Sequence, residues 1–487
     1  MKNIKLLLTT PFMSYKDRWG QYYKGAGDTF PQGIGSIAGY LEKYNIPVDV
    51  LEPDIEGMGR ESFASFIAKG NYDLIGISAF TTNIVFAYET ARLIKSIDSG
   101  IRVVMGGSHP SIFPERTLEE CADIDFIIVK EGEKPLLDLV NALSRNSDVS
   151  DVPNLFFRRN GEVIKNHAAC DWLDLDELPM FPYHKFDMKK YVPAPSLRKV
   201  LPTFNYMAQR GCPYSCAFCD TRTHGKKVRY RSVDKVISDL KELKENCGVK
   251  GIIFEGSNFT IDSDWITRFC EQLTKERLNL VWYCMGRVDL DLDLLPLMKK
   301  AGLWCMSFGI ESGTLQTLER MKKKISSEQV KAALRVVKKL NVRAIGSFIL
   351  GYPGENEEDV RNTIEYACGL NLDVSVFFIP VPFPGTRLFD DAMESGGLKD
   401  NITWEDYVAW LDHSKPIYIN PLLGEKHIDL YNYAFRKFYL RPRYIIRQLM
   451  NIRSLSDISR LLQGFKSIQD LIKKNIFPHL AGHAVKS

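Results

Sequence analysis

The chain has 487 residues, of which 45% are hydrophobic and 25% are charged, and this composition excludes a disordered chain or a fibrous repeat. Its length exceeds what one hydrophobic core usually serves, so we expect two or three domains. No uncharged apolar run reaches the roughly 18 residues of a membrane span, and the start lacks a secretory signal, so we expect a cytoplasmic protein. Ten cysteines are too sparse for a disulfide scaffold.

Residues 1–145 alternate short apolar runs with helix-length segments, a pattern typical of a parallel sheet with crossover helices. Strands are predicted at Ile4–Thr9, Val48–Leu51, Leu74–Ser78, Arg102–Met105 and Phe126–Val129. Helices are predicted near Ile34–Lys43, Arg60–Lys69, Ile84–Ile97, Glu115–Cys121 and Lys134–Leu143. The fold class is therefore α/β, beginning with a doubly wound, Rossmann-like domain. A nicotinamide-binding domain is disfavoured because no G-x-G-x-x-G follows the first strand.

Residues 146–200 lose this periodicity and are rich in proline, so we expect an irregular linker. Alternation resumes over 201–400, with strands predicted near Phe204–Ala208, Gly251–Phe254, Val281–Cys284, Met306–Ile310, Ala344–Leu350 and Val374–Ile379. This predicts a partial (β/α)6 TIM-type barrel, in which chemistry collects at the carboxyl ends of the strands. Residues 401–487 are expected to form a helical, basic appendage.

Cys212, Cys216 and Cys219 form a C-x3-C-x2-C pattern on the loop expected after the first barrel strand. Three thiolates on one tight loop can hold three corners of an iron–sulfur cubane and leave the fourth iron open. A zinc site would need a fourth Cys or His at matching spacing, and only His224 lies nearby. The other cysteines are interpreted as buried thiols that act as small hydrophobes.

The segment from Arg210 to Cys219, RGCPYSCAFC, resembles the signature of the radical S-adenosylmethionine (radical SAM) superfamily. The resemblance implies a 4Fe-4S cluster on the three cysteines, whose open iron chelates S-adenosylmethionine. An electron then cleaves this cofactor to a 5′-deoxyadenosyl radical, and an external flavodoxin- or ferredoxin-type donor is expected to supply it. Phe218 is expected to pack near the adenine.

Later motifs carry the same resemblance. Glu311 and Ser312, in Gly309–Gly313, resemble a fourth-strand motif whose glutamate binds the ribose hydroxyls, with a surface carboxylate as the alternative. Gly354, in Gly351–Glu355, matches a turn where backbone amides approach the cofactor, or is simply a tight turn, and Pro384–Arg387 is similar. Arg287 is expected to meet a carboxylate of the ligand or to pair with Asp289.

The strand before Glu255 shows a departure from these relatives. They carry two adjacent acidic residues here that help to receive the methionine amino group, whereas this chain reads Glu255-Gly256-Ser257. Either Glu255 takes over this role or backbone carbonyls do.

Ser78-Ala79-Phe80 and Gly106-Gly107-Ser108-His109 follow the third and fourth strands, where a doubly wound sheet binds ligands. The two segments resemble the Ser-x-Leu and Gly-Gly elements of cobalamin-binding domains, with Phe80 in place of Leu. We therefore expect Ser78, Gly106, Gly107 and His109 to contact cobalamin. The Asp-x-His-x-x-Gly segment that supplies a cobalt-binding histidine in some relatives is absent.

Two other motifs of this domain carry alternatives. Ser108 and Glu131–Glu133 are expected at polar edges of cobalamin, with helix caps as the alternative for Ser108 and Glu133, and His109 is otherwise a satisfied loop histidine.

The combination resembles the cobalamin-binding radical SAM family, which includes class B methyltransferases and the anaerobic Mg-protoporphyrin IX monomethyl ester cyclase group. This implies methylation of an unactivated carbon in a small-molecule or lipid-like substrate, with a radical cyclase or rearrangement enzyme as the alternative. A cobalamin-binding protein without enzymatic activity is a minor alternative, which the intact cysteines disfavour. No catalytic residue beyond the cluster ligands is assigned. Candidates for the barrel cavity are Tyr283, Met285, Phe308, Ser347, Phe378 and Arg387.

The tail from Arg436 to Ser487 holds eleven Lys/Arg and two Asp/Glu, a local charge of +9. Nucleic acid is disfavoured as a partner because stacking aromatic residues and a recognition module are lacking. Apolar residues recur among the arginines, so the tail is predicted to contact anionic lipid at a membrane surface, or else to pack as an ordinary helix on the barrel.

Overall fold

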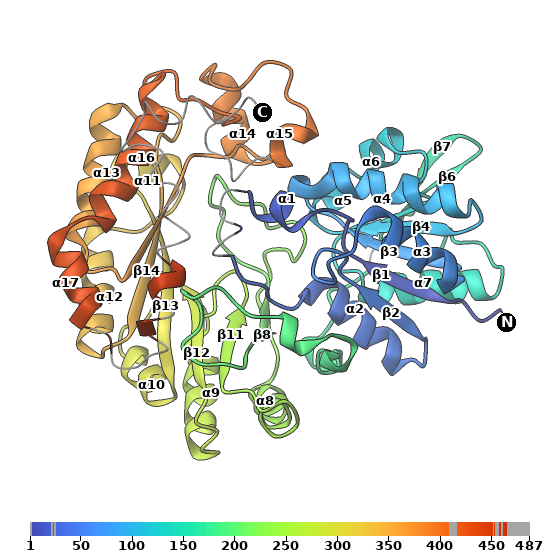
Figure 1. Ribbon diagram of the computed structural model, residues 1–487, viewed down its shortest axis with the longest axis horizontal. Coiled ribbons are helices and arrows are strands. Elements are labelled where there is room, and N and C mark those ends of the chain that lie inside the picture. The colour runs from blue at the N-terminus through green and yellow to red at the C-terminus, as the bar shows by residue number, and fades with distance from the viewer. Residues whose placement is uncertain are drawn as a thin grey trace.

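The computed structural model describes residues 2–464, except 21–22, 24–25, 169, 409–415, 451, 453–456 and 459–460. Two lobes lie side by side, with the first sheet in one and the second sheet in the other (Figure 1). Within the described ranges, no helix is long and apolar enough to cross a membrane. In the basic tail, residues 451, 453–456, 459–460 and 465–487, which include Leu455, lie outside the described residues.

The first sheet has the strand order β2-β1-β3-β4-β5-β6-β7, and β1 to β5 are parallel. These strands are β1 Leu6–Thr9, β2 Val48–Leu51, β3 Leu74–Ser78, β4 Arg102–Gly106 and β5 Phe126–Ile128. The helices are α1 Tyr15–Trp19, α2 Gln32–Lys43, α3 Arg60–Gly70, α4 Ile84–Ile97, α5 Ser108–Ile112, α6 Pro114–Glu120 and α7 Glu133–Ser144. Helices α2 and α7 bury one face, and α3, α4 and α6 bury the other. The predicted doubly wound fold is confirmed.

A β-hairpin, β6 Leu155–Arg159 and β7 Glu162–Lys165, extends the first sheet antiparallel to β5. It lies inside the segment 146–200, which was expected to be irregular throughout. Its signal was the Asn160-Gly161 turn, where both residues have positive φ (54° and 84°), as a tight two-residue hairpin requires. The segment is irregular before Leu155 and after Lys165, with short 3₁₀ turns at Leu175–Glu177, Tyr183–Lys185 and Met188–Lys190.

The second sheet is entirely parallel, with the order β8-β11-β12-β13-β14-β15. Its strands are β8 Thr203–Met207, β11 Gly251–Glu255, β12 Val281–Gly286, β13 Leu303–Glu311, β14 Arg343–Ile349 and β15 Val374–Phe378. The helices are α8 Val233–Cys247, α9 Ser263–Lys275, α10 Leu294–Lys300, α11 Leu315–Arg320, α12 Ser327–Lys339 and α13 Glu357–Gly369. In the described part of the chain, β15 does not pair with β8, so the barrel is partial, as predicted.

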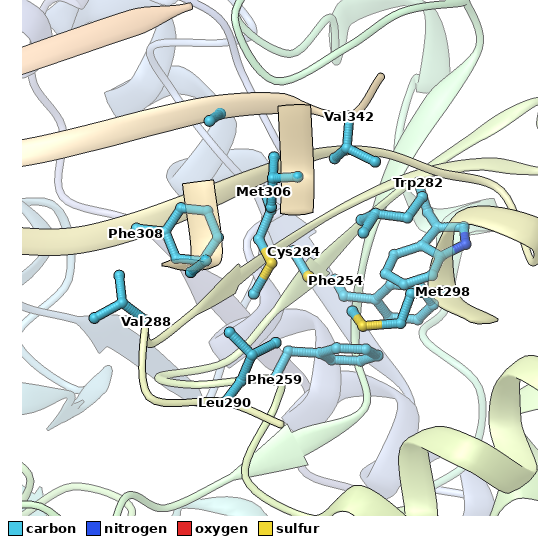
Figure 2. Packing of buried hydrophobic residues seen from close by; sticks show 14 of the residues in the cluster. Phe254, Phe259, Trp282, Cys284, Val288, Leu290, Met298, Met306, Phe308 and Val342 are labelled. Carbon is cyan, nitrogen blue, oxygen red and sulfur yellow. The ribbon is translucent and has the colours of Figure 1, made fainter. Parts of the chain in front are cut away.

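The largest core lies between this sheet and its helices. Figure 2 shows Phe308 in this outer layer together with Met306 and Cys284. The expectation that Phe308 faces a cavity is therefore wrong, because the inward positions of β13 alternate with it. Arg387 is also no cavity residue, since its exposed guanidinium pairs with Asp391 at 2.7 Å.

The inner face of the barrel is less tightly covered at the carboxyl ends of its strands. Met285 is 46% exposed, and Glu255, Ser347 and Phe378 are partly exposed. In a parallel sheet that is otherwise buried on both faces, such exposure marks the ends where a ligand has room.

The carboxyl-terminal helices are α14 Arg387–Glu394, α15 Trp404–Val408, α16 Lys426–Tyr439 and α17 Pro442–Met450. Helix α16 packs on the barrel edge, where Phe435 and Phe377 meet edge to face at 5.3 Å and the Tyr439 hydroxyl donates to Ser375 O at 2.7 Å. Helix α15 returns to the first domain, where the Trp404 indole donates to Glu120 at 2.6 Å.

Candidate active site

The three cysteines lie on one loop that is closed at its base by a pair of short strands. These are β9 Gln209–Arg210 and β10 Arg229–Tyr230, which pair antiparallel with Arg210 opposite Arg229. Gly211 has φ 88°, and a Cβ there would lie 2.1 Å from Lys227 O, so only glycine fits where the loop begins.

The loop is fastened to the carboxyl ends of the barrel strands by backbone hydrogen bonds. Ala217 N donates to Met321 O at 2.9 Å, and Leu388 N donates to Ala217 O at 2.8 Å. Segments that follow β13 and β15 therefore hold the middle of the cysteine loop, at the rim where barrel chemistry is expected.

Cys212, Cys216 and Cys219 are free thiols, and they lie close enough together to affect one another's pKa. Burial raises the pKa of Cys216, and burial followed by the neighbouring Cys216 and Cys212 raises the pKa of Cys219 to about 11. Among the described residues, no group of three or more His, Cys, Asp or Glu side chains converges on a position for one metal ion. A cubane does not require its three thiolates to converge on one point, as a single zinc ion does, because each thiolate binds a different iron.

Glu311 ends β13 beside this loop, at a bulge in the pairing with β14. Its φ is 67°, a left-handed conformation that is strained for a glutamate and that clusters at functional sites. The carboxylate is buried and lies 2.9 Å from the ammonium of Lys323, which in turn lies 5.9 Å from the centre of the Phe218 ring. The structure thus brings together Glu311 and Phe218, with Lys323, which sequence reasoning missed.

Arg287 takes the second of its two expected roles. It grips Asp289 through two nitrogens at 2.9 Å each, and it donates to Lys323 O at 2.8 Å. Its guanidinium also lies 3.8 Å from the ring centre of Tyr214 in the cysteine loop, within cation–π range. Arg287 therefore contacts both the cysteine loop and the turn at Lys323, and it holds the two together.

Ser312 and Gly354 belong to a buried polar network around Glu355. The Ser312 hydroxyl lies 3.1 Å from Thr363 Oγ1 and 3.4 Å from Glu355 Oε1. Glu355 accepts from the backbone amides of Gly351 and Tyr352 at 2.8 Å each, and Gly354 supplies a φ of 83°. These amides already have a partner, and the turn motif gave no sign of Glu355 as their acceptor.

Glu255 lies at the end of β11, where Asn205 Nδ2 donates to it at 2.9 Å. Burial raises the pKa of Glu255 to about 7, opposed by hydrogen bonds from Asn205 and Thr29. A Cβ on Gly256 would lie 2.7 Å from Gln209 Oε1. The missing acidic side chain at 256 thus leaves the space that Gln209 fills.

Ser78 and Gly106 lie opposite each other in the register of β3 and β4, as expected for one rim. Ala79 N donates to Gly106 O at 2.8 Å. Gly107 has φ 110°, and a Cβ there would lie 2.3 Å from Ala79 O, whereas a Cβ on Gly106 would meet only Ile128 O at 3.5 Å. Gly107 is needed for the crossing of the two loops, and Gly106 leaves the rim open.

His109, in α5, packs against the segment that follows β3. It is fully buried, with Nδ1 3.1 Å from Thr81 Oγ1 and its ring 4.6 Å from the Trp404 ring. Burial lowers its pKa to about 4, so the imidazole is neutral. The chain places Trp404, 295 residues further on, over the histidine that the sequence suggested for cobalamin.

Glu131, in the loop after β5, and Glu133, at the start of α7, both contact the base of the cysteine loop. Glu133 accepts from Arg210 at 2.6 Å, and Glu131 accepts from Arg229 at 2.5 Å. The carboxyl edge of the first sheet therefore meets the carboxyl edge of the second at the cysteine loop, seen between the lobes in Figure 1.

Two family models match the chain in the order of its sheets. The model described as the B12 binding domain matches residues 23–140, and that of the Radical SAM superfamily matches residues 206–367. The fold and the cysteine loop thus define a radical SAM protein with a cobalamin-binding domain.

Known proteins resemble the chain over most of its length. It is 31% identical over 442 residues to an uncharacterized methyltransferase of Pyrococcus horikoshii, covering 89% of this chain and 93% of that protein. It is 27% identical over 441 residues to the anaerobic magnesium-protoporphyrin IX monomethyl ester cyclase of Rubrivivax gelatinosus, covering 86% and 75%. Accordingly, the chain belongs to the family of radical SAM enzymes with a B12-binding domain.

A solved structure shows the same fold. TsrM from Kitasatospora setae, a radical S-adenosylmethionine methyltransferase with cobalamin and a [4Fe-4S] cluster bound, superimposes with a TM-score of 0.69 at 15% identity. The match covers 97% of this chain and 99% of that one.

The family makes the protein an enzyme whose cofactors are a [4Fe-4S] cluster, S-adenosylmethionine and cobalamin. Its residues fit these groups. Three free thiols share one anchored loop, a strained carboxylate lies beside it, and a side-chain-free backbone opens at Gly106.

Proposed function

We propose that the protein methylates an unactivated carbon of a small molecule. The observation that carries this is the meeting of the two carboxyl edges, through which Glu131 and Glu133 contact both ends of the cysteine loop. Cofactors bound at the carboxyl edges of the two sheets would then face one shared space. When bound, the cluster supplies the electron that cleaves S-adenosylmethionine, and cobalamin supplies the methyl carrier.

We assign each site residue a role that its position supports. Cys212, Cys216 and Cys219 hold the cluster, and Ser78 with Gly106 and Gly107 forms the backbone rim for cobalamin. Phe218 and Glu311 receive the adenine and the ribose of S-adenosylmethionine, and Lys323 orients the Glu311 carboxylate.

The other expected site residues are assigned supporting roles. Ser312 and Gly354 shape the turn around Glu355, and Glu255 offers a carboxyl group at the barrel mouth. His109 supports the cobalamin rim through its packing under Trp404.

An external flavodoxin- or ferredoxin-type protein delivers the electron. Arg222 pairs with Asp220 at 2.6 Å, but Lys226 and Lys227 of the same loop are also exposed, so the loop carries a net positive charge that suits an acidic donor. Charge reversal at Lys227 should slow cluster reduction by the donor protein and leave reduction by dithionite unchanged.

The lipid-facing part of the proposal rests on helix α17, whose polar side faces the barrel. Tyr444 donates to Asp373 O at 3.0 Å, and Arg447 donates to Leu372 O. The opposite side is apolar and open to solvent, with Ile445 43%, Ile446 57%, Leu449 60% and Met450 77% exposed.

An apolar helix face flanked by the basic tail suits an anionic membrane surface, from which a lipid-like substrate would reach the barrel. The full-length protein should sediment with vesicles containing phosphatidylserine, and replacing Ile446 and Leu449 with Ser should abolish this. Failure of the unaltered protein to sediment would remove the membrane contact and leave the methylation proposal intact.

The proposed reaction is tested without knowledge of the substrate. The anaerobically reconstituted, reduced enzyme is incubated with S-adenosylmethionine labelled in its methyl group. A methyltransferase of this type should release S-adenosylhomocysteine and leave the label with the cobalamin. Formation of 5′-deoxyadenosine alone, without label transfer, would instead favour a cyclase or rearrangement, which the similarity to the Rubrivivax gelatinosus cyclase keeps as the second candidate.

A further inference from the structure

An ion-pair cluster joins the first domain to the base of the cysteine loop. Glu131 Oε1 lies 2.5 Å from Arg229 Nη2, 3.0 Å from His224 Nδ1 and 3.4 Å from Arg210 Nη1. Glu133 Oε1 lies 2.6 Å from Arg210 Nη2 and accepts from Ser36 Oγ at 2.7 Å. Two carboxylates thus bind two guanidinium groups across the domain boundary.

The two arginines are the cross-strand pair that closes the loop. Arg210 immediately precedes Gly211-Cys212, and Arg229 ends the return of the loop after Cys219, with His224 between them. The geometry of residues 211–228 therefore depends on where Arg210 and Arg229 are held, and both are held from the first domain.

The ion-pair cluster is almost entirely buried. The side chains of Arg210, Glu131, Glu133 and Arg229 are 4%, 7%, 3% and 9% exposed. A buried ion pair contributes little net stability compared with an apolar packing, but loss of one partner leaves an unpaired buried charge. Such an arrangement fixes one geometry strongly, and this is its use at the base of a metal-binding loop.

Trp172, in the linker, also packs against the base of the cysteine loop. Trp172 lies 5.0 Å from the Arg229 guanidinium, and a Cβ on Gly225 would lie 2.6 Å from the Trp172 ring. Gly225 O is the acceptor for Cys212 N at 3.2 Å. The indole therefore presses Arg229 and the closing turn of the loop together.

We propose that Glu131 is a positioning residue for the cysteine loop, so that the cobalamin-binding domain sets the geometry in which the three thiols receive the cluster. This inference rests on the proposed role of Cys212, Cys216 and Cys219 as cluster ligands. Glu131 acts only through Arg229, Arg210 and His224, and it does not touch the cluster.

The experiment compares Glu131→Gln with the unaltered full-length protein. Glutamine keeps the shape and one acceptor but removes the charge that two arginines share. In the apoprotein, the amides of residues 211–228 should exchange hydrogen at least about tenfold faster, since a single lost charge-assisted contact exceeds the free energy of a tenfold change. In the reconstituted protein, an iron chelator should remove the cluster at least about tenfold faster, and the electron paramagnetic resonance spectrum of the reduced cluster should broaden.

Two controls isolate the position. Glu276→Gln removes a carboxylate from a surface pair with Lys241 at 2.7 Å and should change none of these readouts. Glu131→Asp keeps the charge but shortens the side chain. Its resonance spectrum should largely match that of the unaltered protein, which would assign the effect to the charge and not to the packing of the longer side chain. If Glu131→Gln does not fold, Arg229→Lys, which keeps a cation but loses the bidentate contact, is measured in the same way.

Each outcome decides between the claims. If the unaltered protein binds no [4Fe-4S] cluster, the proposed function fails, whatever the variants do. If it binds the cluster while Glu131→Gln matches it in exchange, chelation rate and spectrum, the positioning role is overturned and the cluster assignment stands.

Discussion

The Glu311 carboxylate accepts a hydrogen bond from the buried ammonium of Lys323 at 2.9 Å. Both side chains are 8% exposed, and the pair forms where β13 ends at a strained backbone position. Oε1 faces the lysine, so the contact fixes the direction of the carboxylate and leaves Oε2 to receive hydroxyl donors of a ligand.

This pair gives a prediction that separates binding from stability. Glu311→Gln should weaken S-adenosylmethionine binding and destabilise the protein by about 3–5 kcal/mol, because Lys323 is left as an unpaired buried charge. The double variant Glu311→Gln/Lys323→Met should recover stability but not binding. Thermal unfolding and calorimetric titration with S-adenosylmethionine measure the two effects, and normal binding by the double variant would contradict the ribose assignment.

The three cysteines give the most direct prediction. The reconstituted protein should contain about four irons, and Cys216→Ala should lose most of them because a cubane needs three protein thiolates here. Cys170→Ala is the matched control, since Cys170 is a partly buried free thiol outside the loop. Iron and sulfide analysis checks this, and equal iron loss in both variants would argue against a specific site.

Adjacent glycines at the cobalamin rim are predicted to respond differently to a side chain. Gly107→Ala should lower the unfolding temperature, because its Cβ would meet Ala79 O at 2.3 Å in a backbone with φ 110°. Gly106→Val should leave the unfolding temperature nearly unchanged but weaken cobalamin binding, since the nearest atom to a Cβ there is 3.5 Å away.

Gly161→Ala serves as the control for backbone strain alone, with φ 84° and no atom within 4 Å of the added Cβ. Absorbance titration with cobalamin and thermal unfolding separate the cases. Unaltered cobalamin affinity in Gly106→Val would place the cofactor elsewhere.

Glu255 predicts a pH dependence of stability. Burial raises its pKa from 4.5 to about 7, so between these values the folded protein keeps a proton that the unfolded chain has released. Folding then takes up a proton, and stability should fall as pH rises from about 4.5 to about 7, by at most about 1.4 kcal/mol per pH unit from this group. Above pH 7 the contribution is constant.

The check is thermal unfolding of the unaltered protein and Glu255→Gln at pH 5, 6, 7 and 8. The difference between them should shift in favour of the glutamine variant up to about pH 7 and then level off. Glu276→Gln, on the surface, should show no such trend. A constant difference across the series would mean that Glu255 is ionised throughout.

Local features of the sequence were enough to predict most strands and the cysteine loop. Leu74–Ser78 and Ile84–Ile97 begin and end as expected, because apolar periodicity and turn residues act over a few positions. The β6–β7 hairpin was missed since the surrounding prolines masked a clear Asn160-Gly161 turn signal. Phe308 was assigned to the wrong face because a buried parallel strand is apolar on both faces, so its sequence does not show which residues point inward.

The contacts that several site residues make could not be predicted, because they join distant parts of the chain. His109 is covered by Trp404, and Glu131 meets Arg229 across 98 residues. No local pattern encodes such a partner. Lys323 likewise reaches Glu311 only because the turn after α11 folds back under the loop.

Phe30 belongs to the first domain by sequence, yet its ring packs in the core of the second. It stacks on Tyr191 at 4.3 Å and meets Phe204 of β8 at 4.7 Å, while its backbone exchanges hydrogen bonds with the Asn205 side chain at 2.9 and 2.8 Å. A residue of the first lobe therefore completes the core of the second, and the two lobes are not interchangeable modules. A chimera that takes its cobalamin-binding part from a relative will have to bring along the segment around Phe30 together with the aromatic residues from Phe181 to Tyr191, or it will open a hole beside the first barrel strand.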